Sequence, residues 1–475
     1  MNHAAAANTA VMGSGWWRSA IGGAAMSVVL VAGSAWTAAA VDGASTLAVQ
    51  APAAYADSGV PVSLSLIDAG GSPIAGAPVS VERQVDGSWS PMATITTDET
   101  GEASIEVVLS RDPADNLIRV SYAGDETHAP ADTGEVLLAL KRRDSRLRVT
   151  GPGSVVDETR TRLVVRWTTG SGAPVSGRVR LYRRVIGGEW RPAGSVTTDA
   201  AGRAERSVGP REDTLWRARV SQQAWLRSAV SASHRIDNRP PHAPVVLPSD
   251  APQPRIALPP QPRATGAGAR PVVSQISDAV WSQMTGRSWH AGCPVGRAGL
   301  RLLRINYWGY DGYRYRGELV AAVEVVDQMA GALTDVYDAG LPIRSMYRVD
   351  RFGWSSRLRG ADDYASMAAG NTSAFNCRDV VGRPGVRSPH STGRSIDINT
   401  WENPYRSAQG TVPNTWWQSR SHPLVAWRSG DHAMVRIMRA HGLAWSYGLG
   451  DTQHFDARRS ARVGVDPGCA TTVCE

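Results

Sequence analysis

A gapless internal repeat constrains this chain more than any other feature of its sequence. Residues 73–101 align with residues 174–202 at a constant offset of 101 residues. Within this alignment PIAGAPVSV matches PVSGRVRLY, Trp89 matches Trp190, and TTDETG matches TTDAAG. A fixed offset over so long a stretch indicates a duplicated domain of about 100 residues. The first half of the chain is therefore predicted to hold two copies of one fold.

Each copy has the pattern of a β-sandwich. Apolar and polar residues alternate at residues 79–81 and 104–107, with the period of two that half-buried strands show. The pairs Asp86-Gly87 and Gly187-Gly188 lie between such runs, and both are typical of tight hairpin turns. Many short alternating runs separated by turns indicate sandwiches rather than helical domains.

The motif G-x-P-[IV]-x-G, followed by W…TTD-x-x-G, resembles bacterial Ig-like surface domains. The resemblance covers roughly residues 45–237. It implies a spacer or a wall-docking stalk, and specific adhesion to a ligand is the alternative. No catalytic constellation lies in this part of the sequence, and the fold does not by itself specify a function.

The N-terminus carries an export signal. Residues 19–41 form an uncharged, largely apolar run after Arg18, and they end in three alanines, Ala38 to Ala40. A positive flank, an apolar stretch and a small-residue end are typical of a secretory signal. The run is also long enough to remain as an uncleaved membrane anchor. In both cases we expect everything after residue 41 to lie outside the cytoplasm.

Export also determines how the four cysteines are interpreted. In an oxidising compartment they are most simply two disulfides. The short separation of Cys469 and Cys474 favours pairing these two, which leaves Cys293 to pair with Cys377. A zinc site of four cysteines is the rival interpretation, but Cys293 and Cys377 each lack a neighbouring ligand at metal-type spacing.

The charge balance points to an anionic partner. The formal net charge is +8, and Lys141 is the only lysine among 51 basic residues. Such an excess suits a cell-wall polymer. The arginines form no basic block, and the chain is exported, so no nucleic-acid partner is expected.

Beyond the repeats the sequence changes twice. Residues 239–270 are rich in proline, which favours an extended, semi-rigid linker. From residue 271 onward the pattern is mixed. Apolar residues recur at helical spacing across residues 318–339, and residues 343–346 have the pattern of a short strand that leads to Arg348.

Two short motifs in this last part carry chemistry. SPHSTGRSIDIN, residues 388–399, places His390 before a strand in which Asp397 faces away from two isoleucines. DTQHF, residues 451–455, supplies His454. Two imidazoles and a carboxylate are the ligand set of a catalytic zinc site, which leaves the fourth position for water. Asp451 would accept the proton of that water, and Arg348 would stabilise the oxyanion formed at the attacked carbonyl.

These motifs resemble the D-alanyl-D-alanine carboxypeptidase family of zinc peptidases, which is related in fold to the hedgehog signalling domain. The resemblance rests on S-x-H-x-x-G-x-x-x-D followed by [DE]-x-x-H, supported by IRSMYR (343–348) and NTSAFNCR (371–378), and covers about residues 290–458. The residues that carry the paired motifs are Ser388, His390, Gly393, Asp397, Asp451 and His454.

The resemblance implies a role for each site residue. His390, Asp397 and His454 would be zinc ligands, Asp451 the general base and Arg348 the oxyanion stabiliser, with Arg344 as the alternative to Arg348. Ser388 has no Gly-x-Ser-x-Gly frame around it, so we expect it to form hydrogen bonds near the metal rather than act as a nucleophile.

The sequence thus predicts a multidomain protein: two β-sandwich Ig-like domains and an α+β zinc peptidase domain with an antiparallel sheet. The expected boundaries are 1–41 for the signal or anchor, 42–140 and 141–238 for the sandwiches, 239–270 for the linker and 271–475 for the peptidase. We expect an exported, cell-wall-associated enzyme that hydrolyses peptidoglycan stem peptides, as a carboxypeptidase or an endopeptidase. The alternative is a non-catalytic wall-binding or adhesion protein with a peptidase-like fold.

Overall fold

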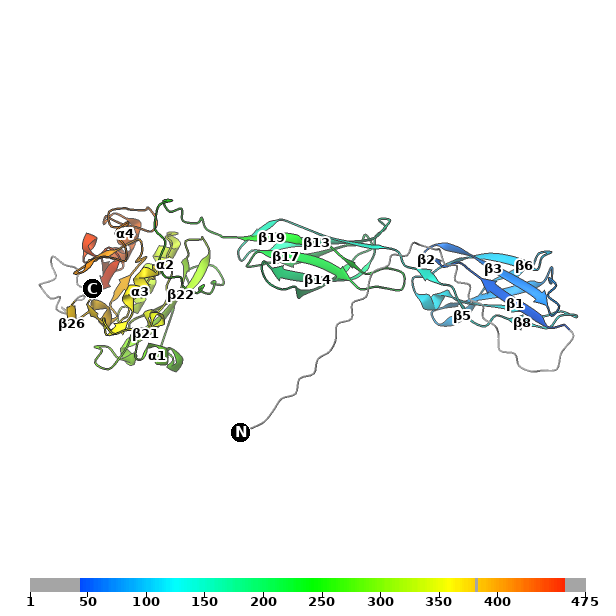
Figure 1. Ribbon diagram of the computed structural model, residues 1–475, viewed down its shortest axis with the longest axis horizontal. Helices are drawn as coiled ribbons and strands as arrows, with labels where there is room; N and C mark the ends of the chain where they lie inside the picture. The colour runs from blue at the N-terminus through cyan, green and yellow to red at the C-terminus, as the bar shows by residue number, and fades with distance from the viewer. Residues whose placement is uncertain (1–42, 381–382, 458–475) are drawn as a thin grey trace, which may run out of the picture.

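The computed structural model describes residues 43–380 and 383–457. The expected signal or anchor, residues 1–41, lies outside this part of the chain, as do Cys469 and Cys474. The described residues form two strand-rich bodies and a third, mixed body, which follow one another along the longest axis of the molecule (Figure 1). Within the described ranges, no helix has both the length and the apolarity needed to cross a membrane.

The first body is a β-sandwich. One sheet has the order β1-β3-β6 and the other β5-β4-β7-β8, with β9 beside β7. The strands are β1 (Ser45–Gln50), β3 (Gly59–Asp68), β4 (Pro78–Val85), β5 (Ser88–Thr96), β6 (Glu102–Val108), β7 (Leu117–Tyr122), β8 (Ala131–Asp132) and β9 (Val136–Leu137). Alternate residues of β3 are buried, and their side chains form one core with those of β4 and β7. The alternation predicted from the sequence therefore matches the two faces of the strands.

The second body repeats this arrangement. Its sheets have the orders β11-β13-β16 and β12-β19-β17-β14-β15, with β18 beside β17. The strands are β11 (Ser145–Thr150), β12 (Ser154–Val156), β13 (Thr161–Thr169), β14 (Gly177–Val185), β15 (Arg191–Thr198), β16 (Arg203–Val208), β17 (Thr214–Val220), β18 (Ala229–Val230) and β19 (His234–Arg239). The shared strand order supports the duplication that the constant offset indicates.

The repeated TTD-x-x-G motif has the same structural role in both sandwiches. Thr97 and Thr198 are buried, and each hydroxyl donates to a backbone carbonyl, that of Ile74 or of Val175, at 2.7 Å. The following aspartates accept backbone N–H groups of the turn. The motif therefore satisfies buried polar groups where two strands connect.

The glycine that ends the motif is required by its backbone. Gly202 has φ +70°, and a Cβ there would lie 2.4 Å from the carbonyl oxygen of Trp167. Gly101 in the first sandwich has φ +71° and meets the carbonyl oxygen of Leu66 at 2.6 Å in the same way. Only glycine avoids both the left-handed strain and the close approach.

Polar contacts connect neighbouring bodies. Arg143 donates to the carbonyl of Ala56 at 3.1 Å, and Ala56 is part of the second sandwich's core. At the other junction, Arg211 pairs with Asp157 at 3.0 Å and donates to the carbonyl of Ala264 at 2.6 Å. Glu158 of the second sandwich pairs with Arg314 of the third body. Each junction is thus held by arginines that bridge two bodies.

The proline-rich segment packs against the third body. Residues 240–270 hold no helix or named strand, as the sequence predicts, but they do not form a detached spacer. The Gln261 side chain exchanges hydrogen bonds of 2.7 and 2.9 Å with the backbone of Met346, and the Trp401 indole donates to the carbonyl of Pro252 at 2.7 Å. The Met346 backbone and the Trp401 side chain therefore hold this segment against the third body. The proline content of the segment does not predict that packing.

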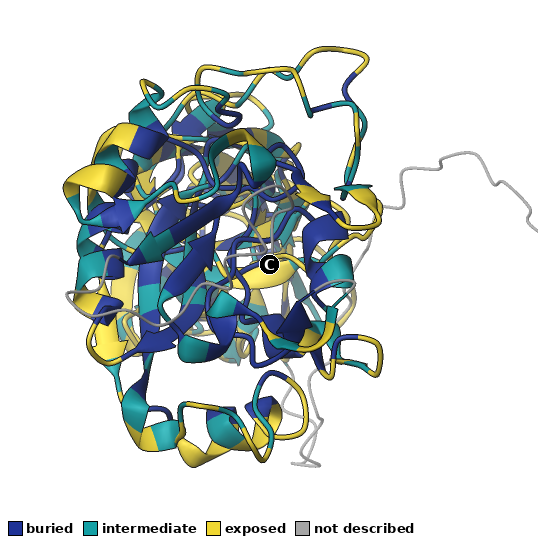
Figure 2. Cartoon of the chain, turned by 90° about the vertical axis from the view of Figure 1, so that its left-hand side faces the viewer, coloured by how far each residue is buried: buried dark blue, intermediate teal, exposed yellow. Residues whose placement is uncertain are grey.

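The third body combines antiparallel sheets with helices. One sheet has the order β20-β21-β22 and another β27-β31-β30. These strands are β20 (Val272–Ser274), β21 (Leu300–Trp308), β22 (Arg314–Ala322), β27 (Ser395–Asp397), β30 (Leu443–Ala444) and β31 (His454–Ala457). The helices are α1 (Asp278–Met284), α2 (Val326–Asp338), α3 (Asp363–Ala368) and α4 (Ala433–Ala440). In Figure 2 buried strands lie in the interior of this body, and exposed loops surround them.

Short two-stranded ladders complete this body. Their strands are β23 (Trp354–Ser355) with β24 (Gly360–Ala361), β25 (Asp379–Val380) with β26 (Arg383–Arg387), and β28 (Tyr405–Ser407) with β29 (Gly410–Val412). In the first sandwich β2 (Ala54–Tyr55) pairs with β10 (Leu140–Lys141).

One helix is shorter than the sequence predicts. The helical stripe at residues 318–339 begins in β22, and α2 starts only at Val326. Residues 318–322 pair with residues 300–304 of β21, within a ladder that spans all of both strands, so tertiary pairing overrides the local apolar spacing. Residues 343–346 are not a named strand, although Ser345 forms a parallel bridge with Asn371.

The main core of this body covers one face of both sheets. Leu303, Ile305 and Leu319 from β21 and β22 pack in it with Ile396 of β27 and Phe455 of β31, and α2 and α4 supply the opposing side chains. Alternation along the strands sends the intervening residues to the opposite face. Backbone hydrogen bonds from Phe375 to Val320 and between Ser373 and Asp397 connect the two sheets.

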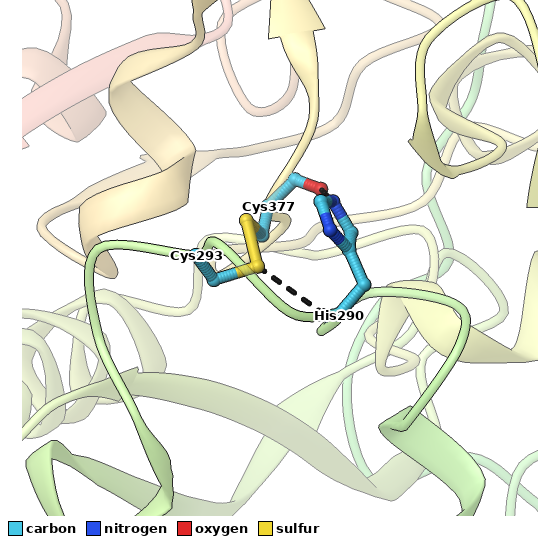
Figure 3. Close-up of side chains that lie close together, drawn as sticks. All are labelled: His290, Cys293 and Cys377. Atoms are coloured by element: carbon cyan, nitrogen blue, oxygen red, sulfur yellow. Dashed lines mark hydrogen bonds between the residues drawn. A yellow bond between two sulfur atoms is a disulfide. The ribbon is translucent and has the colours of Figure 1, made fainter.

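A disulfide anchors the connecting segment. Cys293 and Cys377 are bonded, as the pairing preferred from the sequence predicts, and Figure 3 shows His290 beside them. The backbone N–H of Cys377 also donates to the carbonyl of Ser288 at 2.9 Å. Because both sulfurs are used in the disulfide, His290, Cys293 and Cys377 form a structural cross-link rather than a thiolate metal site.

The glycine requirement gives a prediction for the second sandwich. Gly187 also has a positive φ, +82°, but a Cβ there would meet no atom within 4 Å. We expect Gly187→Ala to lower the free energy of local opening by about 1 kcal/mol, and Gly202→Ala to lower it by about 1–3 kcal/mol more because of its clash. Hydrogen exchange of the β13 amides in the full-length protein measures both. Equal effects of the two substitutions would contradict this account.

Candidate metal centre

Strand pairing brings two predicted ligands face to face. In the antiparallel register of β27 and β31, Asp397 lies directly opposite His454, and Ser395 opposite Asp456. The alternate residues Ile396 and Phe455 are fully buried in the main core. All four polar side chains therefore lie on the face opposite to that core.

A short helical turn brings in the third ligand. His390 lies in the 3-10 helix η4 (Pro389–Thr392), whose N-cap is Ser388. The Ser388 hydroxyl accepts the His390 N–H at 3.3 Å, so this serine caps the turn as expected for a residue that is not a nucleophile. Gly393 ends the turn with φ +73°, and a Cβ there would lie 2.8 Å from the backbone nitrogen of Ala322. The glycine lets the chain turn back toward β27.

The three side chains converge at nearly equal distances. His390 Nε2 lies 3.0 Å from His454 Nδ1 and 3.1 Å from Asp397 Oδ2. His454 Nδ1 lies 3.0 Å from Asp397 Oδ1. All three residues are at most 2% exposed. The structure thus brings together the ligand set that the sequence predicts.

The second nitrogen of each imidazole determines what the first can do. His390 Nδ1 lies 2.6 Å from the carbonyl oxygen of Ala374, which can only accept, so this nitrogen carries the proton. His454 Nε2 faces Asp456 Oδ1 at 2.8 Å and carries its proton for the same reason. In the neutral rings, His390 Nε2 and His454 Nδ1 are then acceptors. Two nitrogen lone pairs and one carboxylate point at one another, an arrangement that a cation stabilises.

The donor set fits zinc. Two imidazole nitrogens and one carboxylate oxygen are common ligands of catalytic Zn²⁺, and ligands about 2.0–2.1 Å from a tetrahedral ion lie about 3.3 Å apart. The observed separations of 3.0–3.1 Å are close to that value. Three protein ligands also leave a fourth position for water or substrate.

Asp456 contacts a candidate ligand and was not predicted from the sequence. It accepts from His454, and from the Ser395 hydroxyl at 2.6 Å. Burial alone would raise the pKa of its carboxyl, but the hydrogen bonds from His454 and Ser395 hold that pKa well below its usual value. The sequence does contain a signal for its position: residues two apart on a strand share a face, and Asp456 follows His454 by two.

Asp451 is completely buried three residues before His454. It follows the 3-10 helix η5 (Gly448–Gly450) and forms an isolated antiparallel bridge with Tyr405. A fully buried carboxylate is rare unless it is paired or has a specific role.

Arg348 is held by acidic neighbours. Its Nε and Nη2 each donate to Asp350 at 3.1 Å, its Nη1 donates to Glu318 at 3.0 Å, and its Nη2 also bonds to Gln283. These bonds use four of the five N–H groups of the guanidinium. Among the described residues, no hydrogen bond links Arg348 to the three ligands.

The alternative arginine has a different environment. Arg344 pairs with the fully buried carboxylate of Glu402 and lies 4.3 Å from the ring centroid of Tyr310. Burial by itself lowers the pKa of Arg344, but Glu402 and Tyr310 raise it above its usual value. Arg344 is therefore part of a buried ion pair.

A comparison with protein families matches the part of the chain that holds this centre. Residues 381–457 match the family described as D-alanyl-D-alanine carboxypeptidase. The matched stretch includes His390, Asp397, Asp451 and His454. The match supports a peptidase domain of this family in the C-terminal part of the chain. No curated protein matches the chain.

Two solved structures are similar to parts of the chain. The D0–D1 domain of intimin shares 18% identity, with a TM-score of 0.17, over 41% of this chain and 97% of that one. A tetra-tandem repeat from the extending region of a large adhesion protein shares 12% identity, with a TM-score of 0.28. This second match covers 59% of the present chain and 63% of the other. Similarities this low carry no argument about fold or function.

The orientation of His454 gives a second prediction. We expect Asp456→Asn to weaken zinc binding about 10- to 100-fold, because the amide no longer orients the imidazole as the carboxylate does. Competition with a chelator measures the affinity. Asp335→Asn is the matched control, since Asp335 pairs with His441 at 2.7 Å outside the centre. Unchanged affinity in the Asp456 variant would show that this pair does not tune the ligand.

Proposed function

We propose that this protein is an exported, zinc-dependent peptidase that hydrolyses peptidoglycan stem peptides. The observation that carries the proposal is the convergence of His390 Nε2, His454 Nδ1 and the Asp397 carboxylate within 3.1 Å. The family match over residues 381–457 supports the peptidase class. Zinc bound there would polarise a water molecule and lower its pKa toward neutrality.

The chain's own residues orient and desolvate the site. The carbonyl of Ala374 and the carboxylate of Asp456 each hold one imidazole in the tautomer that turns an unprotonated nitrogen inward. The main core lies directly behind the ligand-bearing strands and excludes water from that side. A dry, preorganised setting strengthens each electrostatic interaction with the reacting groups.

Two further residues complete the proposed chemistry. Asp451, which is completely buried three residues before His454 in the sequence, would take the proton from the attacking water as a general base. Arg348 would stabilise the negative charge that develops on the carbonyl oxygen, through the Nη1 N–H that its contacts with Glu318, Asp350 and Gln283 leave unused. Arg344 is the alternative, although its guanidinium is committed to Glu402.

The proposed location follows from the cysteines and the N-terminal sequence. A structural disulfide such as Cys293–Cys377 persists in oxidising compartments. The apolar run at residues 19–41 supports export. The positive net charge suits an anionic wall polymer, and the two sandwiches would serve as the stalk that positions the peptidase there.

Substitution of a ligand and of the base should give different results. We expect His454→Ala to lose both zinc and hydrolysis of a stem peptide, because one of the three ligands is gone. Asp451→Ala should keep about one zinc per chain and lose turnover by roughly 10²–10⁴-fold. Metal analysis of the purified variants and release of D-alanine measure the two effects. Normal turnover of the Asp451 variant would refute its role as base.

A pair of arginine variants separates the two oxyanion candidates. We expect Arg348→Lys to retain zinc and to lower kcat by roughly 10²–10³-fold, because lysine cannot reproduce the planar donor set. Arg344→Lys should affect kcat less. The assay is stem-peptide hydrolysis at saturating substrate, with hydrogen exchange as a check on folding. A larger loss in the Arg344 variant would transfer the role to that residue.

The same assay tests the non-catalytic alternative. Chelator-sensitive release of D-alanine supports a carboxypeptidase, and release of larger fragments supports an endopeptidase. Binding of wall material with zinc present but without hydrolysis of any stem peptide would instead indicate a binding module on a peptidase-like fold.

A further inference from the structure

A small pocket next to the proline-rich segment has an unusual lining. It encloses about 400 Å³, and its lining residues are Pro259, Pro260, Gln261, Pro262, Arg304, Arg316, Glu318, Tyr347 and Arg351. The prolines and the tyrosine form a stiff wall, and the Tyr347 hydroxyl bonds to the carbonyl of Pro259. The other side chains are mainly charged, so this pocket differs from an apolar ligand site.

The pocket and the metal centre lie on the same face of the sheets. Leu303 and Leu319 enter the main core, so their neighbours Arg304 and Glu318 point to the opposite face. Asp397 and His454 point to that face too, since Ile396 and Phe455 enter the same core. The strand segment at residues 373–375 connects the two sets of strands by backbone hydrogen bonds.

The register also gives the separation between the two sites. Two strand spacings separate Asp397 from β22, and Glu318 lies two residues along that strand from Val320, which bonds to Phe375. With about 4.8 Å between strands and about 3.3 Å per residue, the distance is on the order of 10–15 Å. An extended peptide covers that distance with about three or four residues.

The pocket carries a surplus of positive charge. Three guanidinium groups and one carboxylate line it, which leaves two positive charges in excess. Glu318 is already shared, because it lies 2.9 Å from Arg304, 3.0 Å from Arg348 and 3.6 Å from Arg351. One carboxylate cannot neutralise all the cations around it.

Among the described residues, Arg316 is the one arginine of the pocket lining that forms no ion pair with Glu318. Its Nη1 donates to the carbonyl of Arg270 at 2.7 Å and to Asn306 Oδ1 at 2.9 Å, both neutral groups. In the described ranges it takes part in no ion pair. Burial lowers its pKa, and repulsion from Arg304 and Arg270 lowers it further, against a smaller opposing effect of Glu318. An anion in the pocket would relieve this repulsion.

We infer that this pocket binds a carboxylate of the substrate, on a residue about three or four positions from the bond that is cleaved. Arginine's planar fork matches a carboxylate in a bidentate fashion, and about 400 Å³ leaves room for a peptide side chain that ends in one. The inference rests on the proposed peptidase function and adds an acidic residue to the substrate it names. Arg316 would be the main contact, and Arg304 and Arg351 would supply further positive charge.

Binding to the metal-free protein tests this inference without hydrolysis. The probes are two acetylated peptides, D-Glu–Lys(acetyl)–D-Ala–D-Ala and its D-Gln analogue, titrated calorimetrically into full-length, chelator-treated protein. We expect the acidic peptide to bind about tenfold more tightly, as a charge-assisted hydrogen bond implies. Equal affinity of the two peptides, or no binding of either, would overturn the inference.

Variants of the pocket localise the preference. We expect Arg316→Gln to bring the two affinities within about twofold of each other, and Arg351→Gln, at an exposed position, to reduce the preference as well. Arg301→Gln is the matched control, because Arg301 lies on the same strand as Arg304 but bonds only to backbone carbonyls and does not line the pocket. Retention of the full preference in the Arg316 variant would overturn the assignment.

The two proposals can fail separately. If the zinc-loaded protein hydrolyses no stem peptide while the acidic peptide still binds more tightly through Arg316, the peptidase function is refuted and the carboxylate site stands. If hydrolysis occurs without any preference for the acidic peptide, the carboxylate site is refuted and the peptidase function stands.

Discussion

In a buried place, one nitrogen of His390 and one of His454 lie 3.0 Å apart, and each lies within 3.1 Å of one oxygen of Asp397; much of the C-terminal body is arranged to hold them there. The antiparallel pairing of β27 with β31 aligns two of these residues, and the capped turn η4 supplies the third. The Cys293–Cys377 disulfide anchors the segment whose Ala374 carbonyl orients His390. Converging acceptors repel one another, so the surrounding structure has to hold them in place. A bound cation would offset this electrostatic repulsion.

The two sandwiches and the proline-rich segment are joined to the C-terminal body by specific contacts. Two sandwiches with the same strand order precede the C-terminal body along the long axis of the molecule (Figure 1). Arginine contacts at each junction, such as those of Arg143 and Arg211, connect neighbouring bodies. The proline-rich segment adds a wall to the arginine-lined pocket by packing on Met346 and Trp401. A segment whose composition indicates a spacer therefore shapes a candidate binding site.

The features that local sequence patterns did not predict depend on partners distant in sequence. Residues 318–322 have helical spacing but pair with β21, because a full antiparallel ladder outweighs local preference. The sequence predicts Arg348 as a candidate, and its hydrogen-bond partners Glu318, Asp350 and Gln283 are visible only in the structure. The spacing of two places Asp456 on the same strand face as His454, but the 2.8 Å contact between the two side chains is visible only in the structure.

The sequence by itself determined the duplicated sandwich and the identity of the three candidate ligands, because each depends on local spacing or on a constant offset. It favoured the Cys293–Cys377 pairing only by elimination, and the structure shows that bond. A period of two assigns side chains to faces, and a fixed offset reveals duplication without any knowledge of packing. Only the tertiary structure decided the tautomers of His390 and His454, the partners of Arg348 and the unneutralised charge around Arg316. These depend on which carbonyl, carboxylate or cation lies within a few ångströms, and strand register and chain packing set those distances.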